Sequence, residues 1–216
     1  VALEQLYLQY QYSPWLRVRM GELVVPVGMI NSYHQPSEYF TVQRPLAETA
    51  LLPSVWHETG VEVGGTIGQA RYQLQMVTAL DSTGFSGYGF VRGGMQRKLE
   101  VRNAKSLAFV AHGEWGFAPG VVAGASFYTG DSAPNRPRQN LNVKANVNIA
   151  SVYGRYERGP FTVRGQALVG QVQNSAWITQ ANYNTFNGSI LGTSRTPVGK
   201  RAVAYSLEAG YDIFSI

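Results

Sequence analysis

The sequence has no cysteine, little charge and no long apolar run. Only 14% of its 216 residues are Asp, Glu, Lys or Arg, against about 25% in ordinary soluble domains. Without cysteine there is no disulfide framework, no thiolate nucleophile and no thiolate metal site. No stretch approaches the roughly 18 consecutive apolar residues of a transmembrane helix, which excludes helical membrane spans.

Signals for catalysis are equally sparse. The three histidines (His34, His57 and His112) are scattered and lack the spacing of a metal-binding motif. Residues 84–87 (GFSG) fall short of the nucleophile elbow of hydrolases, and no helix is expected after them. The sequence therefore predicts neither an enzyme nor a cofactor or metal site. A barrel-based lipid enzyme is disfavoured because no serine and histidine are paired.

Aromatic residues and glycine are, by contrast, abundant. Aromatics make up 12% of the chain and there are 24 glycines, while the mean hydropathy is only −0.14. This combination is typical of a β-barrel with one apolar and one wet face. A soluble β-sandwich shares part of it and is an alternative. The net charge of +5 by itself suggests anionic small solutes or lipid phosphates as readily as nucleic acid; we expect no nucleic-acid partner.

Alternating apolar and polar residues predict about nine strands. Most are about 10–13 residues long, above the soluble average of about 5–6 and close to the 9–11 that span a bilayer on a tilt. Aromatic residues gather at their ends, as an interfacial girdle requires. The predicted strands are residues 3–12, 15–25, 58–68, 71–80, 104–117, 121–130, 143–157, 161–172 and 201–213.

The connections between these strands alternate between short and long. Outer-membrane barrels have this plan, with tight periplasmic turns and long extracellular loops. We therefore expect an all-β fold, a transmembrane antiparallel up-and-down β-barrel, with residues 1–216 as a single segment. Because single-chain bacterial barrels usually have even strand numbers, nine strands predict an incomplete segment of a larger barrel. A missed or spurious strand is the alternative.

The stretch from residue 21 to residue 65 also carries a motif. A glycine-led strand runs into Pro-x-Gly, then Asn, His-x-Pro, Arg-Pro and Pro-x-x-Trp, and ends in Glu-x-Gly-x-x-x-Gly. In this chain the motif residues are Gly21, Pro26, Gly28, Asn31, His34, Pro36, Arg44, Pro45, Pro53, Trp56, Glu58, Gly60 and Gly64. The pattern resembles the phosphate-selective porin family and related Gram-negative outer-membrane porins.

This resemblance implies a channel of about 16 strands, typically a homotrimer, in a bacterial outer membrane. Its surroundings would be the lipid bilayer and lipopolysaccharide, and its solutes small anions. In characterised members a basic ladder in the lumen selects phosphate. The charges predicted to face the lumen here are mixed, which favours a general or weakly selective pore.

The predicted pore lining includes an arginine pair, Arg17 and Arg19, on one face of a strand. Two guanidinium groups would lower the barrier for an anion. Alternatively, they pair with Glu58 or Glu62 on the next strand and stiffen the wall. The full predicted lining is Arg17, Arg19, Glu58, Glu62, Arg71, Gln73, Gln75, Glu114, Lys144, Arg164 and Glu208.

Two of the long loops carry excess positive charge. A basic rim would concentrate anions at the pore entrance, within about 8–10 Å at physiological salt. Binding to phosphates and carboxylates of lipopolysaccharide is the alternative. The predicted rim is Arg92, Arg97, Lys98, Arg102, Arg136 and Arg138.

Residues 29–56 form a long loop between the predicted strands 15–25 and 58–68. A loop above about 15 residues is usually functional or disordered, and this one has enough apolar residues to pack. We expect it to fold against or into the barrel and narrow it, as a constriction loop. Its motif residues are His34, Arg44, Pro45 and Trp56.

Together these features predict an outer-membrane channel for passive diffusion of small hydrophilic solutes, with a mild anion preference. A non-conducting outer-membrane barrel, acting as scaffold or partner-binding component of a larger assembly, is the alternative function.

Overall fold

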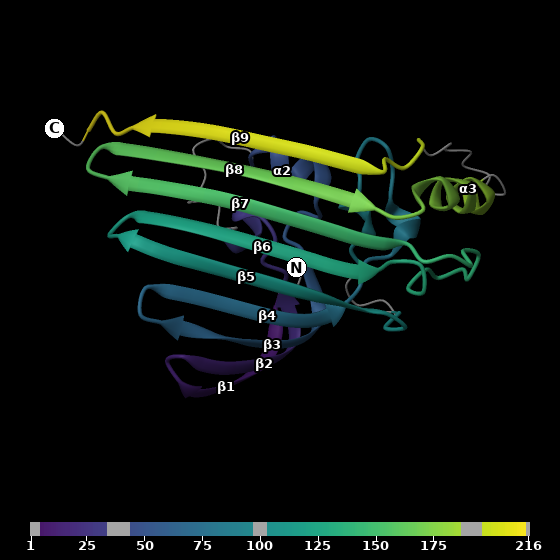
Figure 1. The fold of residues 1–216 in the computed structure, drawn as a ribbon, viewed down its shortest axis with the longest axis horizontal. Coiled ribbons are helices and arrows are strands. Elements are labelled where there is room, and N and C mark those ends of the chain that lie inside the picture. The colour runs from purple at the N-terminus through teal and green to yellow at the C-terminus, as the bar shows by residue number, and fades with distance from the viewer. Residues whose placement is uncertain (1–4, 34–43, 97–102, 187–195, 215–216) are drawn as a thin grey trace.

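The protein is all-β, with nine strands in one antiparallel sheet (Figure 1). The computed structural model describes residues 5–33, 44–96, 103–186 and 196–214. Each strand pairs with the next along the chain, so the topology is up-and-down. The strands are β1 (Leu6–Ser13), β2 (Leu16–Val24), β3 (His57–Ile67), β4 (Ala70–Thr78), β5 (Leu107–Ala118), β6 (Val121–Asp131), β7 (Asn146–Arg158), β8 (Phe161–Val172) and β9 (Arg201–Tyr211).

The predicted all-β fold and its nine strands are confirmed. The bounds of β8 are the predicted ones, and the other ends lie within a few residues of prediction. Within the described ranges β1 and β9 do not pair with each other, so the sheet is open at both edges. The observed architecture is therefore an open, curved up-and-down sheet.

Short helices occupy the long connections. They are α1 (Met29–Ser32), α2 (Leu46–Leu51), the 3₁₀ turns η2 (Ser82–Gly84) and η3 (Arg92–Gly94), and α3 (Ser175–Phe186). Helix α3 was not expected from the sequence, because its segment has no clear apolar stripe; among its residues whose burial is described, Ile178, Ala181 and Asn182 are buried. In the described part of the chain no helix is long and apolar enough to cross a membrane.

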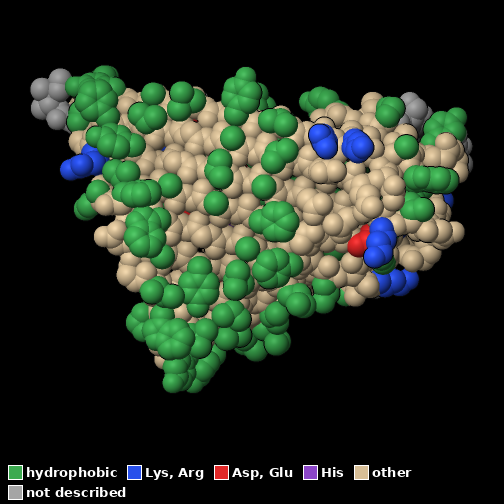
Figure 2. Space-filling model, viewed as in Figure 1, with side chains coloured by type: hydrophobic (Ala, Val, Ile, Leu, Met, Phe, Trp, Pro, Cys, Tyr) green, Lys and Arg blue, Asp and Glu red, His purple; other side chains and the backbone are tan. Residues whose placement is uncertain are grey.

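One face of the sheet, the outer face, exposes large hydrophobic side chains on every strand. Examples are Leu8, Met76 and Tyr205, with exposed fractions of 80%, 51% and 82%. Figure 2 views this face and shows hydrophobic side chains spread across the strands, with Lys and Arg only near its two ends. Period-two alternation puts these residues on one side of the pleat.

The opposite, inner face is covered in part by the long connections; in Figure 1 the connection with α2 lies behind the sheet, and α3 lies beyond the right-hand end of the strands. Four large side chains from three of the connections are buried in one apolar cluster with inward residues of the sheet: Trp56, Phe85, Phe90 and Ile178. The ring of Trp56 lies 4.8 Å from that of Tyr128 on β6. Apolar burial therefore holds the connections on the inner face at the long-loop end.

This cluster corrects the predicted faces of residues 143–157. The prediction that Lys144 lines the pore places Val147 and Ile149, an odd number of residues away, on the outer face. The pairing of β7 is regular throughout, and Val147 and Ile149 are buried inner-face residues of the cluster. Hydrophobicity assigns the wrong face here because the inner residues Val147 and Ile149 pack under the connections, whereas Asn146 and Asn148 on the outer face are polar.

Gly21 of β2 lies close to the backbone of β1. The β2–β3 register runs without a bulge through this position. The φ of Gly21 is +141°, and a Cβ here would overlap the carbonyl of Leu6. Gly21 therefore marks a close backbone approach and not a bulge.

Candidate functional site: the inner face and its docked loop

The β2–β3 loop (residues 25–56) crosses the inner face to reach β6, β7 and β8. The backbone N–H of Gly28 donates to Ser126 Oγ and Ser151 Oγ, both at 3.2 Å. The N–H of Met29 donates to Gln166 Oε1 at 3.4 Å. Asn31 also binds the C-terminal end of the loop, because its Oδ1 accepts the N–H of Trp56 at 3.1 Å. The first turn of the loop is thus bound to three strands.

A buried carboxylate ties the two helices of this loop together. Glu48 of α2, 2% exposed, accepts the N–H of Ile30 at 2.8 Å and that of Asn31 at 3.1 Å. Burial raises the pKa of Glu48 to about 7, against the lowering effect of these two hydrogen bonds and of Arg44. The φ of Gly28 is +87°, and a Cβ there would overlap the Glu48 carboxylate.

Tyr33 anchors the other end of α1 to the wall. Its hydroxyl donates to Glu114 on β5 and accepts from Arg71 Nη2 on β4 at 3.2 Å. The Arg155 guanidinium carbon lies 4.0 Å from the centre of its ring, a cation–π distance. Burial raises the pKa of Tyr33, and the hydrogen bond to Glu114 adds to the rise. The first part of the loop is therefore bound to the strands at Gly28 and Met29 and again at Tyr33.

Arginines outnumber carboxylates in two inner-face clusters. Arg17 Nη2 and Arg19 Nη1 lie 3.3 and 3.6 Å from the same oxygen of Glu62. Arg155 and Arg164 share Glu157 Oε1 at 2.8 and 2.9 Å. Each cluster carries two positive charges and one negative charge.

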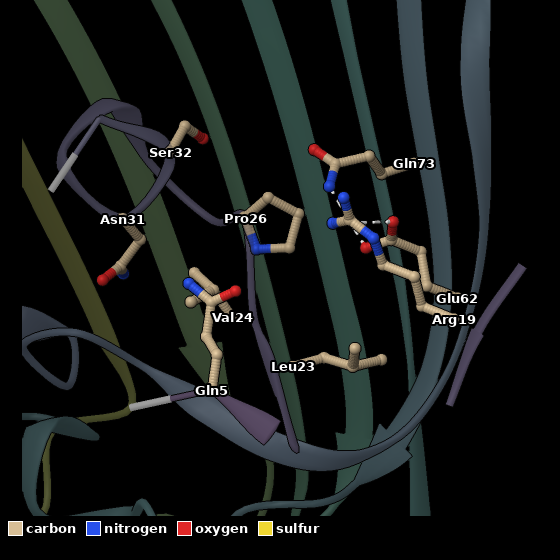
Figure 3. Close-up of a pocket in the computed structure, with 9 residues that line it drawn as sticks. All are labelled: Gln5, Arg19, Leu23, Val24, Pro26, Asn31, Ser32, Glu62 and Gln73. Carbon is tan, nitrogen blue, oxygen red and sulfur yellow. Dashed lines mark hydrogen bonds and ion pairs between the residues drawn. The ribbon is translucent and has the colours of Figure 1, made fainter. Parts of the chain in front are cut away.

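A cavity of about 130 Å³ separates the docked loop from the wall formed by β2 to β4. Figure 3 shows Asn31 and Ser32 on the loop side, facing Arg19, Glu62 and Gln73 on the wall side. Glu62 also accepts from Gln75 Nε2 at 2.8 Å. Polar side chains from both sides thus line the space left beside the loop.

The structure places most of the predicted lining residues on the inner face. Those whose side chains face it from β2, β3, β4, β5, β8 and β9 are Arg17, Arg19, Glu62, Arg71, Gln73, Gln75, Glu114, Arg164 and Glu208. Of the two predicted roles for Arg17 and Arg19, the geometry has the pairing with Glu62.

Two of the predicted lining residues do not line open space. Glu58 is 0% exposed and accepts from Thr78 Oγ1 at 2.5 Å under the packed connections. Lys144 precedes β7 and its side chain is exposed at the long-loop end. The prediction for Glu58 did not include the connections that cover the inner face. The prediction for Lys144 depended on the wrong face assignment for residues 143–157.

The predicted basic rim is only partly present. Arg136 is 1% exposed and bridges three connections, donating to Asn182 Oδ1 at 2.8 Å and Ser82 Oγ at 3.2 Å. It is therefore a packing residue, which corrects its rim role. Arg92 and Arg138 are exposed. Arg97, Lys98 and Arg102 lie outside the described residues.

The loop motif has a structural explanation in part. Pro45 is buried at the start of α2, Arg44 precedes it, and Trp56 is fully buried. His34 lies outside the described residues. Four site residues were not predicted from the sequence: Tyr33, Glu48, Arg155 and Glu157. Counting alternation back from the tight turn at residues 158–160 would have placed Arg155 and Glu157 on the inner face.

Comparison with known proteins gives no family assignment. No family model matches the chain, and no solved structure matches it. The chain is 26% identical over 183 residues to an uncharacterized protein of Aquifex aeolicus (strain VF5). That match covers 83% of this chain and 40% of the relative, so the chain spans well under half of that protein's length.

Proposed function

We propose that this sheet is an arc of an outer-membrane β-barrel of the porin type, and that the barrel conducts small hydrophilic solutes. The observation that carries the proposal is the two-faced sheet. Its outer face exposes large hydrophobic side chains on all nine strands, whereas its inner face carries arginine, glutamate and glutamine. A sheet facing lipid on one side and water on the other requires this division.

The limits of the outer apolar face support a membrane setting. At the short-turn end, exposed aromatic residues include Trp15, Trp115 and Phe161, in the place of an interfacial girdle. At the other end, a row of paired polar residues crosses the strands: Thr129, Asn148, Gln171 and Arg201.

The distance between these limits fits a bilayer. Phe161 and Gln171 are ten residues apart on the outer face of β8. At about 3.3 Å per residue and a tilt of about 40°, this span is about 25 Å high, which is the height of the apolar band of outer-membrane barrels. The open edges of β1 and β9 would be paired in the closed barrel.

The mild anion preference rests on which charges reach the inner surface. The side chain of Arg71 is 49% exposed, while its partner Glu114 is 4% exposed. Arg17 and Arg19 likewise cover Glu62. A solute passing the wall would therefore meet guanidinium groups before carboxylates, which lowers the barrier for anions. The resemblance to phosphate-selective porins adds to this proposal without supplying a phosphate site.

The alternative function, a non-conducting scaffold, is favoured by the packed cluster on the inner face. Three long connections bury Trp56, Phe85, Phe90 and Ile178 there, and such packing could close the barrel. Reconstitution of the purified intact protein in planar bilayers separates the two functions. Discrete conductance steps support the channel, and verified insertion without conductance supports the scaffold.

Charge selectivity is tested by the reversal potential in a KCl gradient. We expect mild anion selectivity for the wild type and a shift toward cations for Arg17→Gln/Arg19→Gln, because Glu62 is left uncompensated. The matched control is Arg158→Gln, an exposed arginine at the last position of β7, which should leave the potential unchanged. A strongly cation-selective wild type would refute the proposed preference.

A further inference from the structure

The outer face of β7, β8 and β9 has an apolar hollow below a group of cations. The hollow has a volume of about 220 Å³ and is lined by Ala150, Val152, Ala167, Val169 and Val203, among others. Ala150 pairs with Val169, and Ala167 with Val152, so the two short side chains lie diagonally among valines. For scale, an apolar protein cavity of about 150 Å³ accommodates benzene.

The cations lie at the long-loop end of this hollow. Arg201 pairs with Gln171 on the outer face, one outward position beyond the Val169–Val203 pair. The carbonyl of Lys200 accepts the N–H of Val172 at 2.9 Å. The carbonyl of Lys144 accepts Asn174 Nδ2, also at 2.9 Å. Lys200 thus lies beside the end of β8 on the β9 side, and Lys144 lies near it on the β7 side.

These cations are available to a ligand. Lys144, Lys200 and Arg201 are exposed, and among the described residues no ion pair engages their side chains. The nearby carboxylate of Asp131 on β6 accepts the N–H of Ala133 at 3.1 Å and that of Ala145 at 2.9 Å. Figure 2 shows Lys and Arg side chains near this end of the face and none among the central hydrophobic side chains.

We propose that this corner binds one membrane lipid with an anionic phosphate headgroup, its phosphate at Lys144, Lys200 and Arg201 and an acyl chain in the hollow. Charge complementarity selects the headgroup, and the apolar lining selects the chain. The position fits, because the polar row of Asn148, Gln171 and Arg201 marks the upper limit of the apolar face. The inference deepens the proposed function, since it requires the outer face to lie in a bilayer.

Native mass spectrometry of the intact protein in detergent tests the site, with phosphatidylglycerol as probe and phosphatidylcholine as its zwitterionic counterpart. We expect one phosphatidylglycerol to be retained in preference to phosphatidylcholine. Each surface cation contributes about a fivefold factor to binding of anionic lipid. Lys200→Gln/Arg201→Gln should therefore weaken phosphatidylglycerol binding about 25-fold. The control Lys105→Gln/Arg158→Gln removes two exposed cations elsewhere and should change binding less than twofold.

The hollow is tested separately by filling it. Ala167→Phe should weaken binding of both lipids by at least fivefold, whereas Ala209→Phe, an outward position at the other end of β9, should not. Excess inorganic phosphate distinguishes a headgroup-only site: displacement of the lipid by millimolar phosphate would overturn the two-part site. Equal retention of the two lipids, or equal effects of the double variant and its control, would overturn it as well.

Failure of this proposal is distinguishable from failure of the proposed function. Flotation with vesicles and protease protection report insertion independently of lipid choice. A protein that inserts but shows no preference for phosphatidylglycerol refutes the lipid site alone. A protein that does not insert refutes the membrane function itself.

Discussion

Glu48 should make docking of the β2–β3 loop depend on pH. In the docked loop its pKa is about 7, against 4.5 in water. A carboxyl whose folded pKa is raised stabilises the docked state fully below pH 4.5, and this stabilisation is lost as pH rises through 7. The difference corresponds to about 3 kcal/mol. Ionisation of the buried Glu48 carboxyl group therefore weakens the docking of α1 and α2 on the inner face.

Amide hydrogen exchange on residues 29–33 measures this directly. The reporters are Ile30 and Asn31, whose N–H groups donate to Glu48. After correction for intrinsic exchange, wild-type protection should fall about 100-fold between pH 5 and pH 8, since about 1.4 kcal/mol is tenfold. Protection within β8 should stay constant and serves as the internal control.

The variant Glu48→Gln removes the titration. One N–H loses its acceptor, at a cost of about 1–3 kcal/mol, so protection of Ile30 or Asn31 should be lower than in the wild type at pH 5. It should then remain flat to pH 8. The same pH slope in the wild type and in Glu48→Gln would refute the assignment of the effect to this carboxyl group.

Further predictions concern the same loop. Tyr33→Phe removes the hydrogen bonds to Glu114 and Arg71 while keeping the ring, so docking should weaken by about 1–2 kcal/mol. The measurement is the rate of protease cleavage within the loop, which should increase. Unchanged cleavage would contradict the anchoring role of Tyr33. Gly28→Ala should undock the loop more severely, because its φ is +87° and the added Cβ overlaps the Glu48 carboxylate. If the loop narrows a pore, Gly28→Ala should raise single-channel conductance, as should deletion of residues 33–51, and unchanged conductance in both would contradict constriction.

The sequence alone determined the strands and most of their inward residues. Period-two alternation is a local property, and tight turns such as residues 158–160 set the register of the strands beside them. This is why β8 was predicted at its observed bounds and why Arg17, Arg19 and Glu62 were placed on one face. The pairing between these residues followed from the register of adjacent strands.

Only the tertiary structure decided what the long connections do. Trp56 and Glu48 come from the β2–β3 loop and Arg136 from the β6–β7 connection. Their burial depends on contacts between residues far apart in the chain, which no local pattern encodes. Packing of those connections buries Glu58, which was predicted to line the pore. The same packing accounts for the apolar residues Val147 and Ile149 on the inner face. Sequence periodicity reports which residues share a face, but the cover on that face arises only when the chain folds.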